Sequence, residues 1–150
     1  MQKLHYSIKI NAPAQKVWDT MLGKGSYSEW TSAFMPGSYF EGSWDKGSKI
    51  RFLAANKDGE MEGMFSEIAE NKPNEYISIR HLGIVTNGVE DTTSEEAKKW
   101  AGQAYENYAL KEKNGITELT VDMDIVDEYK DEIDKAWPGA LEKLKELAEK

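Results

Sequence analysis

The C-terminal segment from Tyr129 to Ala148 has the residue pattern of one long amphipathic helix, and this pattern restricts the fold more than any other feature. Its apolar residues recur every three or four positions and form a single stripe. Pro138 lies inside the stripe and predicts either a kink or a late start of the helix. Because an apolar stripe must be buried against another element, the rest of the chain has to cover it. The stripe consists of Ile133, Ala136, Trp137, Ala140, Leu141, Leu144, Leu147 and Ala148.

A β-sheet is the expected cover, because much of the preceding chain consists of short runs of β-type residues ended by turn residues. Asn114-Gly115 is a typical two-residue hairpin turn, and Asp58-Gly59 predicts a second hairpin. An antiparallel sheet that is covered on one face by a helix curls around that helix. The expected strands span residues 3–11, 38–44, 47–55, 60–70, 75–83, 103–113 and 116–126.

Residues 13–22 separate the first two strands and have the pattern of a short amphipathic helix. Asn11 is the expected N-cap, Pro13 suits the first turn, and Gly23 ends the helix. A further helical turn is expected to end near Trp30. The element order predicts an α+β fold class, in one domain over residues 1–150.

Composition narrows the classes of partner and site. The net charge is −8 and the pI about 4.9, so nucleic acid and anionic membranes are poor partners. The chain has no cysteine, and its two histidines, His5 and His81, are too few for a histidine-rich metal site. No stretch has the pattern of a membrane span or a signal peptide. We therefore expect a cytoplasmic protein with no cofactor, no metal and no integral membrane association.

Four stretches carry a resemblance to a known family. They are "INAPAQKVWDTM", "YSEWTSAFMPGSYFEGSWDKGSKIRF", "EGMFSEI" and "WPGALEKLKELAE". In this order and spacing the chain resembles the START-like (SRPBCC) superfamily, and within it the bacterial single-domain relatives of the activator of the heat-shock chaperone ATPase. The resemblance implies a helix-grip fold, in which a curved antiparallel sheet of six or seven strands wraps around the C-terminal helix. Two short helices follow strand one, and Trp18 on the first of them is an expected core residue.

The resemblance also implies a cavity between the sheet and the helix. Members of the superfamily bind lipids, sterols, polyketides or plant hormones, and a few catalyse cyclisation. We expect a non-enzymatic binding module for an apolar or amphipathic small molecule that is lipid-, sterol- or polyketide-like, with fatty acids among the candidates. One alternative is a cyclase- or hydrolase-type enzyme that uses Glu106 or His81 as acid or base. Another is an interaction protein whose partner is a chaperone.

The Asn114-Gly115 turn assigns the faces of the last hairpin. A two-residue turn places Tyr108 opposite Val121 and Glu106 opposite Met123, so Glu106 points toward the helix together with the apolar face. His81 is in step with Ile79 on the strand "EYISIRHLG" and faces the cavity if the isoleucines do. In the opposite register Arg80 faces inward and could neutralise Glu106, and the sequence leaves both registers open.

The resemblance places ligand contacts on the second short helix, the concave sheet face and the terminal helix. The sequence assigns no residue a catalytic role. The acidic run 127–134 is not a calcium-binding loop, because it lacks the glycine that such a loop requires. The expected ligand-binding residues are Trp30, Phe34, Phe52, Ile79, His81, Glu106, Tyr108, Val121, Met123, Trp137 and Leu141.

Segment 84–102 is expected to be a loop with one short helix, started by a capping box of Thr93 and Glu96. A helix this short with the single large anchor Trp100 cannot be stable alone and must dock. The open end of the grip is the nearest apolar surface, so the segment is a candidate lid with Trp100 as its anchor. The alternative is a decoration fixed on the outside of the sheet.

Overall fold

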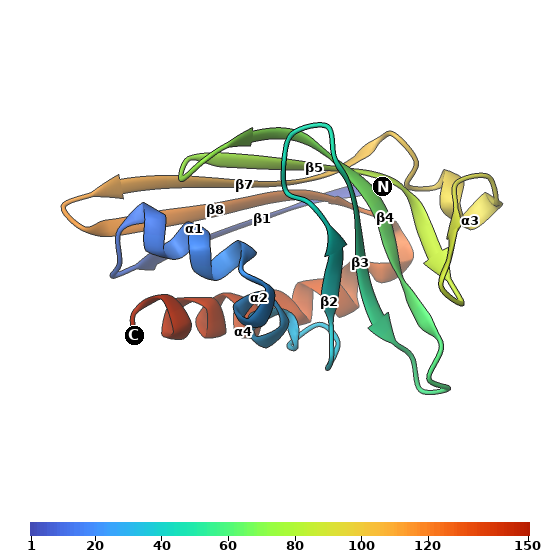
Figure 1. The fold of residues 1–150 in the computed structure, drawn as a ribbon, viewed down its shortest axis with the longest axis horizontal. Coiled ribbons are helices and arrows are strands. Elements are labelled where there is room, and N and C mark those ends of the chain that lie inside the picture. Colours follow the sequence, from blue (N-terminus) through green and yellow to red (C-terminus); the bar gives the residue numbers. More distant parts are fainter.

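The computed structural model describes residues 1–150 and consists of a curved antiparallel sheet that arches over a long C-terminal helix (Figure 1). The strands are β1 (Gln2–Ile10), β2 (Tyr39–Gly42), β3 (Lys49–Ala55), β4 (Met61–Lys72), β5 (Tyr76–Thr86), β6 (Val89–Asp91), β7 (Ala104–Lys113) and β8 (Ile116–Ile125). The helices are α1 (Ala14–Leu22), α2 (Lys24–Thr31), α3 (Glu95–Lys98) and α4 (Lys130–Ala148), and a 3₁₀ turn, η1 (Asp127–Tyr129), precedes α4. None of these helices combines the length and the apolar character that a membrane crossing requires.

The sheet runs in the order β1-β8-β7-β5-β4-β3-β2, and β6 pairs with β5 outside this path. The N-terminal strand therefore lies beside the last strand, and β2 forms the opposite edge. Helices α1 and α2 pack against α4 on the same side of the sheet (Figure 1). This arrangement confirms the predicted helix-grip fold, and β6 is the one strand that the sequence analysis did not predict.

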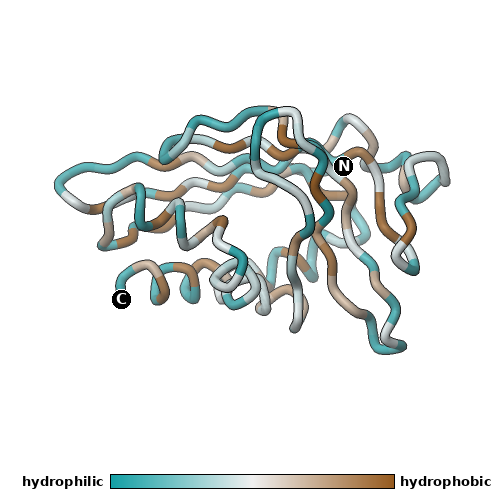
Figure 2. The backbone as a smooth tube through the Cα atoms, in the orientation of Figure 1, coloured by the Kyte–Doolittle hydropathy of each residue, from teal (hydrophilic) through white to brown (hydrophobic).

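Apolar residues alternate with polar ones along the strands, and the tips of the β3–β4 and β7–β8 hairpins are hydrophilic (Figure 2). The apolar face of the sheet and the stripe of α4 enclose one core, to which Trp18 contributes as predicted. Trp137, which is only 2% exposed, lies in its middle. Its ring stacks on Tyr6 at 5.3 Å and meets the edge of Phe34 at 4.9 Å between ring centroids. It thereby joins α4 to β1 and to the segment after α2.

The start of α1 is held by a residue far away in the sequence. Asn11 was predicted to cap this helix, but Pro13 occupies the N-cap position and has no side chain that could accept a hydrogen bond. Instead, the backbone N–H of Ala14 donates to the Glu112 carboxylate at 2.7 Å. Glu112 lies near the tip of the β7–β8 hairpin, so the cap depends on the tertiary fold rather than on the local sequence.

Pro138 does not delay the start of α4, which begins at Lys130 and continues through the proline. Proline lacks the N–H that would bond to the carbonyl of Asp134. Both residues are exposed, so water can satisfy that carbonyl. The proline is tolerated because it lies on the outer side of the helix, away from the sheet.

Segment 84–102 is more regular than predicted. Strand β5 extends to Thr86, and a turn at Asn87-Gly88, with φ angles of 52° and 76°, leads back into β6. Helix α3 is capped by Ser94, one residue after the predicted Thr93. The Ser94 hydroxyl accepts the N–H of Ala97 at 3.1 Å. The capping-box pattern therefore found the helix but not its first residue.

We predict that Glu112→Ala lowers the free energy of unfolding by about 1 kcal/mol, the usual effect of removing an N-cap acceptor. Chemical denaturation of the variant and the wild type measures this difference. Lys113→Ala is the matched control, because Lys113 is an exposed neighbour that holds no helix terminus. Equal losses in the two variants would contradict the capping role of Glu112.

Candidate ligand-binding cavity

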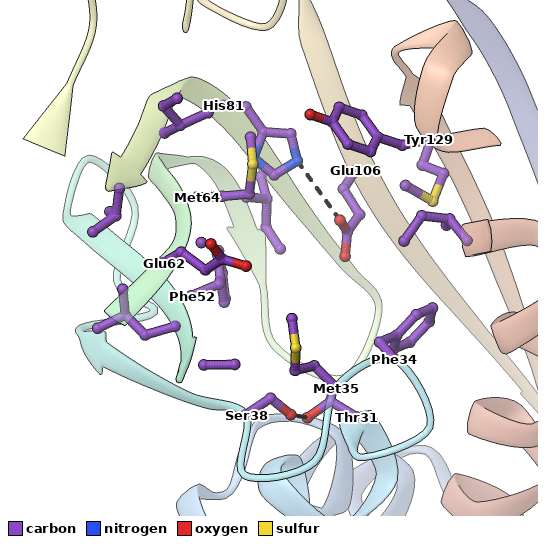
Figure 3. A pocket seen from close by; sticks show the side chains of 18 of the residues that line it. Thr31, Phe34, Met35, Ser38, Phe52, Glu62, Met64, His81, Glu106 and Tyr129 are labelled. Atoms are coloured by element: carbon purple, nitrogen blue, oxygen red, sulfur yellow. Dashed lines mark hydrogen bonds and ion pairs between the residues drawn. The ribbon is translucent and has the colours of Figure 1, made fainter. Parts of the chain in front are cut away.

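A cavity of about 570 Å³ lies between the concave face of the sheet, α2 and the first half of α4 (Figure 3). Of the 30 residues that line it, 21 are hydrophobic, so its wall is mainly apolar. Strands β3, β4, β5, β7 and β8, helix α2 and helix α4 all contribute side chains. The volume falls within the range of about 300–1,000 Å³ that is typical of small-molecule sites.

The structure brings most of the predicted site residues together around this cavity. The sheet supplies one group of them, α2 and the segment after it a second, and α4 a third. The predicted residues that line the cavity are Trp30, Phe34, Phe52, Ile79, His81, Glu106, Tyr108, Met123 and Trp137, together with the predicted lid residue Trp100.

Two predicted residues, Val121 and Leu141, do not line the cavity. They are 0% and 5% exposed, and both belong to the packed core. Leu141 lies one helical turn beyond Trp137, and Val121 lies two residues before Met123 on the same face of β8. The grip is therefore filled by side chains on one side of Trp137 and hollow on the other. Residue periodicity identifies the inner face but not the point along it where the filling ends.

Several lining residues were missed by the sequence analysis. Ile133 lies on the predicted stripe, one turn before Trp137, so the helical period alone could have found it. Met64 is the cross-strand partner of Phe52. It could have been found only with the register of the β3–β4 hairpin, which the sequence did not provide. No sequence signal identified the others, which include Met21, Leu22, Tyr27, Met35, Trp44, Ile84, Val85 and Tyr129.

A small polar cluster interrupts the apolar wall. Glu106 faces Met123 across the β7–β8 pair, which confirms the predicted register and its inward direction. The Tyr108 hydroxyl donates a hydrogen bond to the Glu106 carboxylate. His81 points at the same carboxylate, with 3.6 Å between Nε2 and Oε1 (Figure 3). The side chains of Glu106 and His81 are 22% and 5% exposed, so the cluster is largely shielded from bulk water.

The structure also settles which residue of β5 faces inward. His81 lines the cavity, and its Nδ1 lies 2.8 Å from the hydroxyl of the fully buried Ser66. Arg80 points to the other face of the sheet, where its guanidinium donates to Glu67 at 2.8 Å. Glu106 therefore has no arginine partner.

Two tyrosines near Glu106 keep their protons over a wide pH range. Burial raises the pKa of Tyr108 well above its ordinary value of 10.0, and the charge of Glu106 and the hydrogen bond to it act in the same direction. Burial also raises the pKa of Tyr27, with a further contribution from the charge of Glu106. Both hydroxyls therefore remain hydrogen-bond donors at neutral pH.

Trp100 forms one end of the cavity wall and is only 6% exposed. Its ring stacks on Tyr129 at 5.9 Å and meets His81 edge-on at 6.0 Å. The Tyr129 hydroxyl donates to Glu96 of α3 at 2.7 Å, and this bond is the largest cause of a rise in the Tyr129 pKa to about 12. The segment is thus docked on the grip and forms one end of the cavity wall, while its opening and closing stays a prediction.

The titratable residues do not form a metal centre. No group of three or more His, Asp or Glu side chains lies close enough together to hold an ion.

We predict that the free energy of unfolding falls as the pH rises above about 10, because an unfolded tyrosine ionises near that pH. Tyr27 and Tyr108 have raised pKa values in the fold, so their contribution is fully present below the unfolded pKa. This contribution to stability is lost as the pH rises from about 10 through the higher pKa values that the two tyrosines have in the folded protein. Denaturant titrations from pH 8 to 11 should show a shallower loss for the double variant Tyr27→Phe/Tyr108→Phe. Tyr105→Phe is the control, and an unchanged slope in the double variant would refute the assignment.

A family model supports the relationship that the sequence suggested. The model described as "Activator of Hsp90 ATPase homolog 1-like protein" matches residues 11–149. No curated protein matches the chain.

Solved structures share the architecture at low sequence identity. The Aha1 dimer from Colwellia psychrerythraea matches with a TM-score of 0.71 at 16% identity, covering 99% of this chain and 97% of that one. Protein MLL2253 from Mesorhizobium loti matches with a TM-score of 0.69 at 15% sequence identity, covering 97% of this chain and 96% of that one. DynU16, a putative protein in the dynemicin biosynthetic locus, matches with a TM-score of 0.65 at 13% sequence identity, covering 97% of this chain and 46% of that one. At these identities the likeness shows the fold alone. Because the family model spans nearly the whole chain, the protein belongs to the Activator of Hsp90 ATPase homolog 1-like family, within the START-like superfamily.

Proposed function

We propose that this protein binds an apolar or amphipathic small molecule in the cavity between the sheet and α4. The observation that carries the proposal is a cavity of about 570 Å³ with a mainly hydrophobic wall. A void of this size leaves the lining side chains without contacts on the side that faces the cavity, which costs stability that a well-packed core would not lose. A ligand that fills the space restores those contacts and removes its own apolar surface from water.

The proposal is tested by filling the cavity with a side chain. Ile84 is half-buried and lines the cavity, so Ile84→Trp places the larger ring in space that a ligand would use. Ile116→Trp is the control, because Ile116 is 44% exposed at the β7–β8 turn, outside the cavity. An uncharged solvatochromic dye reports binding, and calorimetry at several temperatures reports the heat-capacity change.

We predict that the wild type and Ile116→Trp bind the dye with a negative heat-capacity change, as burial of apolar surface requires. Ile84→Trp should weaken binding by about tenfold or more, the equivalent of about 1.4 kcal/mol, with a similar melting temperature. Equal dye affinity in all three proteins would contradict binding in the cavity. Native mass spectrometry of freshly purified protein then identifies any ligand carried from the host.

A second candidate function, acid–base catalysis on the bound molecule, is favoured by one observation. Glu106 and His81 both face the cavity, 3.6 Å apart, and such pairs serve as general acids and bases. Ser66, although bonded to His81, is fully buried and cannot reach a ligand as a nucleophile. Chromatography with mass analysis of the co-purified molecule, before and after incubation with the protein, separates the two functions, since only an enzyme converts it into a product of different mass or retention time.

The third sequence-based alternative, a chaperone partner, has less support. The large hydrophobic side chains that are exposed are Met1 at the N-terminus, Val89 at the start of β6 and Ile116 at the start of β8. Stable protein interfaces usually contain a contiguous apolar centre. The exposed residues of this chain therefore do not point to a partner surface.

We further predict that the docked segment 84–102 acts as a lid. Its polar tether is the bond from Tyr129 to Glu96, assisted by the ion pair of Lys99 with Glu128. Tyr129→Phe removes the hydroxyl but keeps the stack on Trp100, so the segment should open more often. Stopped-flow measurements should show dye association and release both faster by about threefold, the effect of one net hydrogen bond at the low end of its range. Lys143→Ala is the control, and unchanged rates in Tyr129→Phe would contradict the lid.

A further inference from the structure

The charged groups around the cavity all have the same sign. Four carboxylates belong to its lining, from Glu62, Glu96, Glu106 and Glu132, and no lysine or arginine does. The whole chain carries a net charge of −8, so the protein as a whole has the same bias. A ligand anion that enters the cavity would find no fixed counter-charge. This argues against the free carboxylate of a fatty acid, which the sequence analysis included among the candidates.

The four carboxylates differ in how many hydrogen bonds and ion pairs they already form within the protein. Glu132 is exposed at the rim. Glu96 accepts a hydrogen bond from Tyr129 and lies 3.1 Å from the Lys99 ammonium. Glu62 accepts a long hydrogen bond of 3.4 Å from Asn56. Glu106 is the inner one, and its carboxylate points into the cavity on the side that faces Phe34 and Met35 (Figure 3).

Glu106 has acceptor capacity that the protein does not use. An ionised carboxylate offers about four lone-pair directions. Tyr108 takes one of them by donating its hydroxyl proton. His81 approaches another, but 3.6 Å between Nε2 and Oε1 is too long for a hydrogen bond. Room therefore remains on Glu106 for at least one strong donor from a ligand.

The rest of the wall suits a cation as well. The rings of Tyr27, Trp30, Phe52 and Trp137 line the cavity, and the faces of aromatic rings attract cations within about 6 Å. Methionine side chains from α1, the α2–β2 segment, β4 and β8 add a polarisable surface that adapts to irregular apolar shapes. An apolar wall also lowers the local dielectric, which strengthens the attraction between a cation and Glu106.

Resting on the proposed function, we propose that the ligand of this cavity is a hydrophobic amine, with an apolar body and one protonated ammonium group that donates to Glu106. The body fills the space between the aromatic side chains, and the ammonium replaces its lost hydration with the Glu106 carboxylate and ring faces. A neutral molecule of the same shape loses the ionic contact, and an anion of the same shape meets repulsion.

The experiment compares three probes that share one naphthyl body and differ in the head group. They are 2-(2-naphthyl)ethylamine, 2-(2-naphthyl)ethanol and the carboxylate anion of 2-naphthaleneacetic acid. Dissociation constants are measured by dye displacement at pH 8, where an ordinary imidazole is uncharged and the alkylammonium keeps its proton. The ammonium should bind the wild type about tenfold tighter than the alcohol, as expected for one added charge-assisted hydrogen bond. The carboxylate should bind more weakly than the alcohol.

Two variants with the same change in net charge separate the site from the general charge of the protein. Glu106→Gln keeps the shape of the side chain but removes the inner charge, and should bring the ammonium to about the affinity of the alcohol while leaving the alcohol nearly unchanged. Glu118→Gln removes an exposed carboxylate at a residue that does not line the cavity, and should keep the preference of the wild type. Melting curves establish that both variants are folded.

The preference of the wild type is decisive even if Glu106→Gln does not fold. Binding of the alcohol as tightly as the ammonium, or tighter binding of the carboxylate, would overturn the inference and leave the proposed function standing. Loss of the preference in Glu118→Gln as well would overturn it too, since net charge would then explain the selectivity. No binding of any probe or of the uncharged dye would overturn the proposed function itself.

Discussion

The structure depends on the burial of one indole ring, that of Trp137. It is 2% exposed and lies among Tyr6, Trp30, Phe34 and Tyr108, with centroid distances of 4.9 to 6.3 Å. Aromatic rings at these distances gain about 0.5–1.5 kcal/mol per pair beyond the burial of their area. Its Nε1–H points at the sulfur of Met123 at 3.1 Å, so the one polar atom of the ring also has a partner. One side chain thus holds together α4, both edges of the β1-β8-β7 group and the segment after α2.

The position of Trp137 also explains why the cavity lies where it does. Beyond the ring, toward the C-terminus, Leu141 and Leu144 pack directly against the core. Before it, Ile133 and Tyr129 are only partly buried and line the cavity. The void therefore begins where the close packing around Trp137 ends.

The sequence contained the architecture because its strongest patterns are local. The Asn114-Gly115 turn defines a register, and the register defines which face of β7 carries Glu106. The apolar stripe of α4 is likewise predicted from the helical spacing of its apolar residues alone. What could not be predicted depends on contacts between distant segments: the cap that Glu112 provides for α1, and the exclusion of Val121 and Leu141 from the cavity. The same limit applies to the charge of the cavity, since its four carboxylates come from four different elements, β4, α3, β7 and α4. The β5–β6 hairpin is different, because its two-residue turn Asn87-Gly88 is a local signal that was overlooked.

The proposed ligand accounts for an acceptor that the protein leaves only partly satisfied. An ionised carboxylate that is largely removed from water loses hydration, and a single neutral donor such as Tyr108 replaces only part of it. Packing for stability alone would favour an apolar residue opposite Met123, or an arginine partner, and Arg80 is close in sequence but turned to the other face. The partly satisfied Glu106 carboxylate thus lies at the wall of the cavity. A ligand that brings its own positive donor would satisfy both at once, by filling the space and completing the coordination of the carboxylate, and neither an apolar molecule nor an anion can do this.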